Sequence, residues 1–353
     1  MIAFRLWLRR RDVLDKTITC GLVGMLAAVS TTTASAHHAA RVIYHTDQII
    51  EVEGEITRLL WRNPHIRFTI NATDAQGGTA RWDVESIPVT RLTRVGVSAG
   101  LIGVGQTVRV AGFPSRRSAN EVYAINLLLP DGREVLLDTP LARWSDNTIG
   151  TGRDETPGIA SSDPSLGVFR VWSTDGVRLP ITNNDSYKLT AEARMDLAEW
   201  DPLSPDSPFR GCTPKGMPTI MEQPNPMELV DHGEQILVRL EEYDTVRVIS
   251  MRNEPADESI PATLLGHSVG HWEGRTLVVE TDRISWRNFN QNGLRQSEVM
   301  ELVERFTPSE DGARLDYELM ITDPALFTEP AVLTKSWVWV PGDQVLPFDC
   351  TEG

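Results

Sequence analysis

The sequence predicts an all-β protein made of two consecutive barrel domains, and three observations support that prediction. Apolar and polar residues alternate along many short segments, which is the period of half-buried strands. Turn-forming residues separate those segments at short intervals. Helical patterns occur only near residues 88–96 and 190–200. The chain of 353 residues is long enough for two domains of ordinary size.

Residues 1–36 have the pattern of an export signal. The apolar stretch "TITCGLVGMLAAV" follows a basic segment, and Ala34-Ser35-Ala36 forms a small-x-small cleavage pattern. That stretch is shorter than the ~20 apolar residues of a bilayer span, so we expect no membrane span. The segment "RRRDVLDK" resembles a loose twin-arginine signal, which leaves the export route open between that pathway and general secretion. We therefore expect a soluble periplasmic or secreted protein that begins at His37.

The charge of the chain argues against anionic partners. The sequence holds 34 Lys and Arg residues against 49 Asp and Glu residues. Removal of the signal, with its five basic and two acidic residues, leaves 29 against 47, a net charge of −18. Such a charge repels phosphate backbones and anionic lipid heads and attracts cations. We therefore expect no nucleic-acid partner.

The cysteines predict one disulfide. Cys20 belongs to the signal, so only Cys212 and Cys350 remain in the exported protein. Two cysteines in an oxidising compartment most economically pair with each other. The bond would close a loop of roughly 140 residues and tie the chain end to the start of the last domain. The alternative is a pair of buried free thiols.

Residues 37–137 are expected to form the first barrel. The segments "QIIEVEGEITRLLW", "HIRFTINATD" and "TARWDVES" have strand patterns, "VTRLTRVGV" has a helical one, and "GQTVRVAGF" and "NEVYAINLLLP" are strands again. Three strands, a short helix and two strands form the order of an oligonucleotide/oligosaccharide-binding (OB) barrel. Gly54 is the expected kink or bulge that lets the first strand serve both sides of the barrel. The fold does not carry the function with it, and the charge opposes nucleic acid here.

Residues 138–211 are expected to be an irregular connector, because turn formers dominate them and Pro recurs. One short helix is expected inside it, with Thr190 as the N-cap. Residues 212–353 return to strands, in the segments "QILVRLEEY", "DTVRVISM", "RTLVVETDRI", "EVMELVERFT", "ARLDYELMITD" and "LTKSWVWVP". Consecutive antiparallel strands with little helix indicate a meander that closes into a barrel or half-barrel of lipocalin outline.

The segment "GHSVG", residues 266–270, matches the G-x-S-x-G pattern of a hydrolase nucleophile elbow, with Ser268 as nucleophile. That elbow requires a strand before the serine, a helix after it, and the acid and the histidine further along the chain. Here a turn and a strand follow, and His271 is the only later histidine. We therefore reject a serine hydrolase and interpret the segment as a loop in which glycines allow a close approach.

Several segments resemble known secreted proteins. The stretch "AHHAA…VEGEITRLLWRNPHIRF" resembles the N-terminal module of an uncharacterised family of exported bacterial proteins, which has a His-His start and an Asn-Pro-His turn. The segments "CTPKGMPTIM", "GHSVGHWEGRTLVVET", "VERF" and "TDPALFTEP" resemble a block of similar secreted proteins. Where the family has an aromatic residue after the histidine pair, this chain has Ala39-Ala40. The resemblance implies export and this domain layout, and it implies no activity.

The first functional hypothesis is a metal site at the N-terminus. Cleavage before His37 frees an α-amine beside an imidazole that can chelate the same ion, with His38 and His65 as further nitrogen ligands and His45 in reserve. This arrangement resembles the histidine brace of copper proteins, and nitrogen ligands suit copper best among the divalent first-row metals. The alternative is that the histidine pair is a polar terminus and that His65 completes a turn. For His65 to join the site, residues 37–47 must fold back over up to ~35 Å.

The second hypothesis is a small-molecule-binding protein or an enzyme that uses the interior of the second barrel. The polar candidates are His267, Glu304, Arg305 and Asp323, with Trp272 and Trp337 as walls. Glu304 and Arg305 are adjacent in a strand and point to opposite faces, so at most one lines the interior. The simpler interpretation pairs Arg305 with a carboxylate and places Asp323 in a turn.

The third hypothesis is an interaction module that serves a periplasmic protein partner without small-molecule chemistry. The histidine cluster favours binding over catalysis, and copper is the one cofactor that the residues suggest. We therefore expect a binding protein for a metal ion or small molecule rather than an enzyme.

Overall fold

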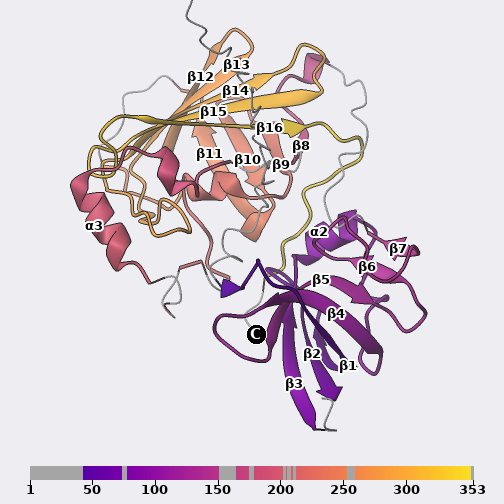
Figure 1. Ribbon diagram of the computed structural model, residues 1–353. Helices are drawn as coiled ribbons and strands as arrows, with labels where there is room; N and C mark the ends of the chain where they lie inside the picture. The colour runs from indigo at the N-terminus through magenta and orange to yellow at the C-terminus, as the bar shows by residue number, and fades with distance from the viewer. Residues whose placement is uncertain are drawn as a thin grey trace, which may run out of the picture. The chain divides into compact units, whose positions relative to one another are not determined.

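Figure 1 shows a computed structural model of the chain, which describes residues 43–73, 78–150, 164–174, 179–201, 204, 208–209, 212–252 and 259–350. Most elements are strands. The α-helices of the described residues are α2 (Val89–Arg94) and α3 (Ala191–Glu199). Both helices were predicted, and the Thr190 side chain accepts the amide hydrogen of Ala193 as the expected N-cap. No helix among the described residues has the length and apolarity to cross a bilayer. The expected signal, His37 and His38 lie outside the described residues.

The first barrel has the predicted OB order. Its strands are β1 (Ile50–Leu60), β2 (Arg67–Thr73), β3 (Thr79–Glu85), β4 (Thr107–Pro114) and β5 (Glu121–Leu128). Antiparallel pairs join β1 to β2, β2 to β3, β1 to β4 and β4 to β5, and the parallel pair of β3 with β5 closes the barrel. Strands β6 (Glu134–Leu136) and β7 (Thr148–Ile149) extend the sheet beyond β5.

Strand β1 serves both sides of this barrel, as predicted. Its first half pairs with β4 and its second half with β2, and Gly54 pairs with both Val108 and Ala72. A Cβ atom at Gly54 would lie 2.2 Å from the carbonyl oxygen of Asn71, so only glycine allows this close approach. The register shift itself lies between Ile56 and Arg58, slightly later than the glycine.

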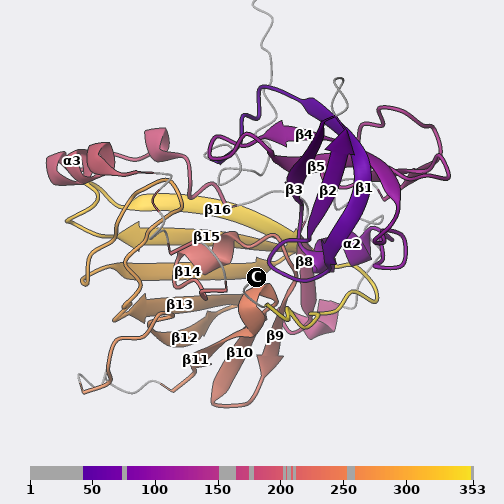
Figure 2. The ribbon, with the colours of Figure 1, turned by 90° about the horizontal axis from the view of Figure 1, so that it is seen from below.

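The second barrel is closed and contains nine strands. They are β8 (Val171–Thr174), β9 (Met227–Asp231), β10 (Gln235–Leu240), β11 (Thr245–Ser250), β12 (His267–Glu273), β13 (Thr276–Asp282), β14 (Glu301–Pro308), β15 (Arg314–Thr322) and β16 (Ala331–Val338). Figure 2 shows β10 to β16 side by side in chain order. The meander is antiparallel except at β11 and β12, which pair in parallel over two residues.

Two segments of this barrel differ from the prediction. Strand β8 lies within the expected connector, residues 138–211, and closes the barrel between β16 and β9. Strand β12 contains most of "GHSVG", which we had interpreted as a loop. The glycine in its middle does allow a close approach, since a Cβ atom at Gly270 would lie 2.8 Å from both Ile249 and Met251 side chains.

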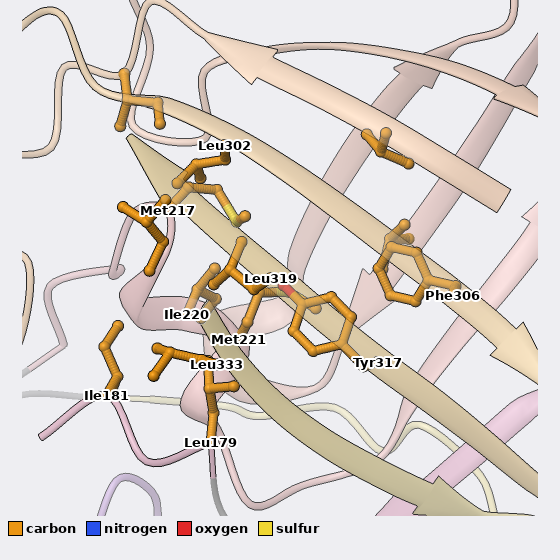
Figure 3. Close-up of a cluster of buried hydrophobic side chains, with 14 of the residues drawn as sticks. Leu179, Ile181, Met217, Ile220, Met221, Leu302, Phe306, Tyr317, Leu319 and Leu333 are labelled. Atoms are coloured by element: carbon orange, nitrogen blue, oxygen red, sulfur yellow. The ribbon is translucent and has the colours of Figure 1, made fainter. Parts of the chain in front are cut away.

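A large cluster of apolar side chains forms the core of the second barrel. The strands alternate buried and outward residues, as in β15, where Leu315, Tyr317, Leu319 and Ile321 are all buried. Figure 3 shows Tyr317 and Leu319 with Leu333 and the side chains of the 3₁₀ turn Thr219–Glu222, which lies among them. This turn buries Ile220 and Met221 completely, so both side chains belong to the core of the second barrel.

The predicted disulfide is present. Cys212 and Cys350 are bonded, with Cα atoms 5.7 Å apart, within the range that the bond requires. The two residues are 138 positions apart in sequence, so the bond ties the end of the chain to the segment before β9. The alternative of two free thiols is thereby excluded.

A buried carboxylate organises the loop after β6. Glu134 is fully buried and accepts backbone amide hydrogens from Arg143 at 2.8 Å, Trp144 at 2.8 Å and Ser145 at 2.9 Å. The Asn126 side chain also donates to it at 2.7 Å. Hydrogen bonds to a charged group contribute about 1.5–3 kcal/mol each, so this carboxylate holds the loop against β5 and β6.

We expect the substitution Glu134→Gln to destabilise the protein by about 2–3 kcal/mol, because it sets an amide donor against backbone donors. Urea unfolding would measure the loss, and hydrogen exchange should accelerate at the amides of residues 143–145. Glu53→Gln is the control, since Glu53 is an exposed member of an ion pair with Arg109 in the same sheet. Equal exchange at residues 143–145 in the two variants would contradict this role.

Candidate functional site

The Asn-Pro-His turn joins β1 to β2 and presents His65 at one corner of the first barrel. Its Asn63–Pro64 peptide bond is cis. The Nδ1 atom of His65 lies 2.7 Å from the carbonyl oxygen of Ser86, just beyond the end of β3. A carbonyl oxygen only accepts, so Nδ1 carries the hydrogen in this contact. In the neutral ring, the lone pair is therefore on Nε2.

The carboxylate of Glu85 lies behind the imidazole. Glu85 Oε1 is 3.8 Å from His65 Nδ1, and Glu85 Oε2 accepts from Arg67 at 2.8 Å. The His65 side chain is 36% exposed and that of Glu85 15%. The ring is thus held from the Nδ1 side while a third of it remains open to solvent. An imidazole that is fixed by a carbonyl or carboxylate at one nitrogen is typical of metal ligands that bind through the other.

The N-terminal segment enters at the same corner. Tyr44 forms an antiparallel bridge with Ser115, and Arg116 donates its amide hydrogen to the Ile43 carbonyl at 2.8 Å. The buried Tyr44 hydroxyl donates to Glu121 at 3.0 Å. Burial raises the pKa of Tyr44 well above its ordinary value, and the negative charges of Glu85 and Glu121 raise it further. Tyr44 therefore lies in the field of the same Glu85 that contacts His65.

This corner can supply one imidazole nitrogen to an ion, and the described residues offer no complete metal site. They contain no group of three or more His, Cys, Asp or Glu side chains that could hold a metal ion. A site built on His65 would need further ligands from the chain before Ile43, where His37 and His38 lie. The donors would then be imidazole and amine nitrogens, which suit copper.

The polar residues inside the second barrel form a closed network. Arg247 donates to Glu304 through both terminal nitrogens, one at 2.9 Å, and to Ser268 and Thr281 at 2.9 and 2.7 Å. The Tyr317 hydroxyl donates to Glu304 at 2.9 Å. Arg247 and Glu304 side chains are 1% and 0% exposed. Burial and the neighbouring Glu304 charge raise the pKa of Tyr317 well above its ordinary value, so its hydroxyl keeps its hydrogen.

The network gives Ser268 a structural position. Its hydroxyl accepts from Arg247 and lies 3.0 Å from the Thr281 hydroxyl, and the residue is 3% exposed. It lies in strand β12, and no helix follows it among residues 269–350. The geometry agrees with the rejection of a nucleophile elbow.

The structure does not bring the expected ligand-binding residues of this barrel together. Arg305 is on the outer face, paired with Glu273 at 2.6 Å, while its neighbour Glu304 points inward. Asp323 is buried in a turn, where it accepts the amide and hydroxyl hydrogens of Ser297, both at 2.8 Å. His267 Nδ1 accepts from Arg283 at 3.0 Å. Each side chain thus has a local structural partner.

The two tryptophans also differ in position. Trp337 is completely buried and packs against Tyr317, whereas Trp272 is 43% exposed and contacts Phe169. Arg247, Tyr317 and Lys335 also lie inside the barrel and were not among the predicted residues. Alternation along the strand could have predicted the burial of Arg247, because this residue is in phase with the buried Thr245 and Ile249 in β11.

Comparison with known protein families gives a match in the N-terminal part of the chain. A model described as a family of unknown function (DUF6152) matches residues 25–122, which include β1 to β4 and the Asn-Pro-His turn. No curated protein and no solved structure matches the chain. Under half of the chain is therefore similar to a family whose description names no activity, and that part includes the corner around His65.

Proposed function

We propose that the protein is an exported metal-binding protein that holds copper or another divalent metal through His37, His38 and His65. The observation that carries this proposal is the hydrogen bond from His65 Nδ1 to the Ser86 carbonyl, which leaves the lone pair of the neutral ring on Nε2. The export pattern of residues 1–36 and the negative net charge support it.

The position of Ile43 supports the participation of the terminal histidines. Only four residues separate His38 from Ile43, and the five Cα–Cα steps between them reach up to ~18 Å when extended. Ile43 and Tyr44 lie along residues 115 and 116, and Tyr44 is electrostatically coupled to Glu85. The terminal histidines therefore precede a segment whose Tyr44 lies in the field of the same carboxylate that contacts His65.

The proposal predicts copper binding that depends on His65 and on the free terminus. Calorimetric titration of Cu(II) into protein that begins at His37 should show one tight site. The substitution His65→Gln should weaken it about tenfold or more, because even the loss of an orienting partner costs that much. One extra residue before His37 should weaken it similarly, since the α-amine then moves away from the imidazole.

The variant His271→Gln is the matched control. His271 is an exposed histidine on strand β12 and contacts Glu273 at 3.4 Å. It should leave the titration unchanged, and the copper EPR spectrum should retain its nitrogen hyperfine pattern. Equal affinities for the wild type and His65→Gln would remove His65 from the site. An affinity unchanged by the extra residue would exclude the terminal amine.

A further inference from the structure

We infer that Asn63 is a positioning residue for His65 and that the disulfide-anchored C-terminal tail, residues 341–350, holds Asn63 in place. The inference rests on the proposed metal site and names what orients its described ligand. Three features of the molecule are involved: the buried asparagine of the turn, the chain end, and the Cys212–Cys350 bond.

Asn63 clamps the two segments that carry the His65 contact. Asn63 is 3% exposed, and its Oδ1 accepts the amide hydrogen of Val89 at 3.0 Å. Ile66 and Ser86 are joined by a backbone hydrogen bond of 3.1 Å on the other side of the contact. The imidazole donor and the carbonyl acceptor therefore lie between two cross-links. Without the Asn63 link, the turn would be held to the segment after β3 from one side alone.

The other half of the Asn63 amide binds the tail. Its Nδ2 donates to the carbonyl oxygen of Phe348, and Asn63 forms a parallel bridge with Cys350. A primary amide supplies both a donor and an acceptor, so Asn63 can bind the tail and the start of α2 at once. A carboxylate of the same shape keeps the acceptor and lacks the donor.

The tail is fixed on both sides of this contact. Phe348 is 1% exposed, packs against Tyr243 with ring centroids 5.0 Å apart, and donates its amide hydrogen to Asp244 at 3.0 Å. Leu346 donates its amide hydrogen to Glu241 at 2.9 Å. The disulfide then fixes Cys350, two residues after Phe348. The carbonyl that Asn63 binds is therefore held in one place.

The test combines copper titration with a measurement that needs no metal. In ¹⁵N-labelled protein, imidazole nitrogen shifts should show that wild-type His65 carries its hydrogen on Nδ1. Asn63→Asp should keep the contact to Val89, lose the contact to Phe348, and mix the two tautomers. Copper affinity should fall about tenfold or more, as for other orienting partners of metal ligands. The double variant Cys212→Ser/Cys350→Ser should have the same two effects with Asn63 intact.

Asn290→Asp is the matched control. Asn290 is 1% exposed, donates to the Ile181 carbonyl at 2.8 Å and accepts the amide hydrogen of Asn292 at 2.9 Å. The substitution therefore removes the same kind of amide donor as Asn63→Asp does, but in the second barrel. It should change neither the tautomer nor the affinity. A wild-type tautomer in Asn63→Asp or in the cysteine variant would overturn the inference. Should wild-type protein bind no copper, the proposed function fails, and the tautomer measurement still decides the role of Asn63.

Discussion

Glu304→Ala should destabilise the protein by about 3–5 kcal/mol, because it leaves the Arg247 guanidinium buried without its counter-charge. The two side chains are 1% and 0% exposed, and both terminal nitrogens of Arg247 bind the carboxylate. The substitution also removes the acceptor of the Tyr317 hydroxyl. Guanidinium-induced unfolding followed by tryptophan fluorescence would measure the change, since Trp337 packs against Tyr317.

Two variants separate the lost charge pair from lost packing. Arg247→Met with Glu304→Leu and Tyr317→Phe replaces the network with apolar groups of similar size, and it should recover most of the lost stability. Arg305→Ala removes the adjacent charge on the outer face of the same strand, where its partner Glu273 is exposed. That change should have little effect. A large loss of unfolding free energy in the apolar triple variant would contradict this expectation. It would show that the polar network stabilises the protein beyond satisfying its own buried groups.

The second large effect is expected at the disulfide. Cys212→Ser/Cys350→Ser should lower the free energy of unfolding by about 4–5 kcal/mol, because the unfolded chain regains the entropy of an open loop of 138 residues. The loss should appear in chemical unfolding of the variant against the oxidised wild type.

Reduced wild-type protein is the control for this prediction. It has the same open loop and retains both sulfur atoms, so it should match the serine variant in stability. A reduced protein as stable as the oxidised one would show that the tail contacts alone hold the chain end. Hydrogen exchange at residues 344–349 would then remain slow after reduction.

The first barrel could be predicted because its information is local. Alternation, turn residues and the short helix α2 occur in OB order along the chain, and the pairs β1–β2, β2–β3 and β4–β5 each join consecutive strands. The second barrel was predicted less completely. Strand β8 has only four residues, too few for alternation to be recognised, and it lies far in sequence from its partners β9 and β16.

The candidate site was likewise predictable in part. The histidine pair, the Asn-Pro-His turn and the two cysteines were visible as residue types. The orientation of His65 was not, because Ser86 O is 21 residues away and becomes its partner only after β2 and β3 pair. Arg305 was a better candidate than Arg247 by its neighbours in sequence, although the closed barrel buries Arg247 and exposes Arg305.

The amino-acid sequence was enough to predict the all-β class, the OB order of residues 37–137, and the pairing of Cys212 with Cys350. Periodicity, turn chemistry and cysteine number are local or countable properties, so no contact needs to be known to apply them. Which charges are buried together, and which side-chain amide holds the His65 turn to the chain end, is known only from the folded structure. Those contacts join residues up to 285 positions apart, as in Asn63 with Phe348, and they form because polar groups that are buried away from water need hydrogen-bond partners within the protein.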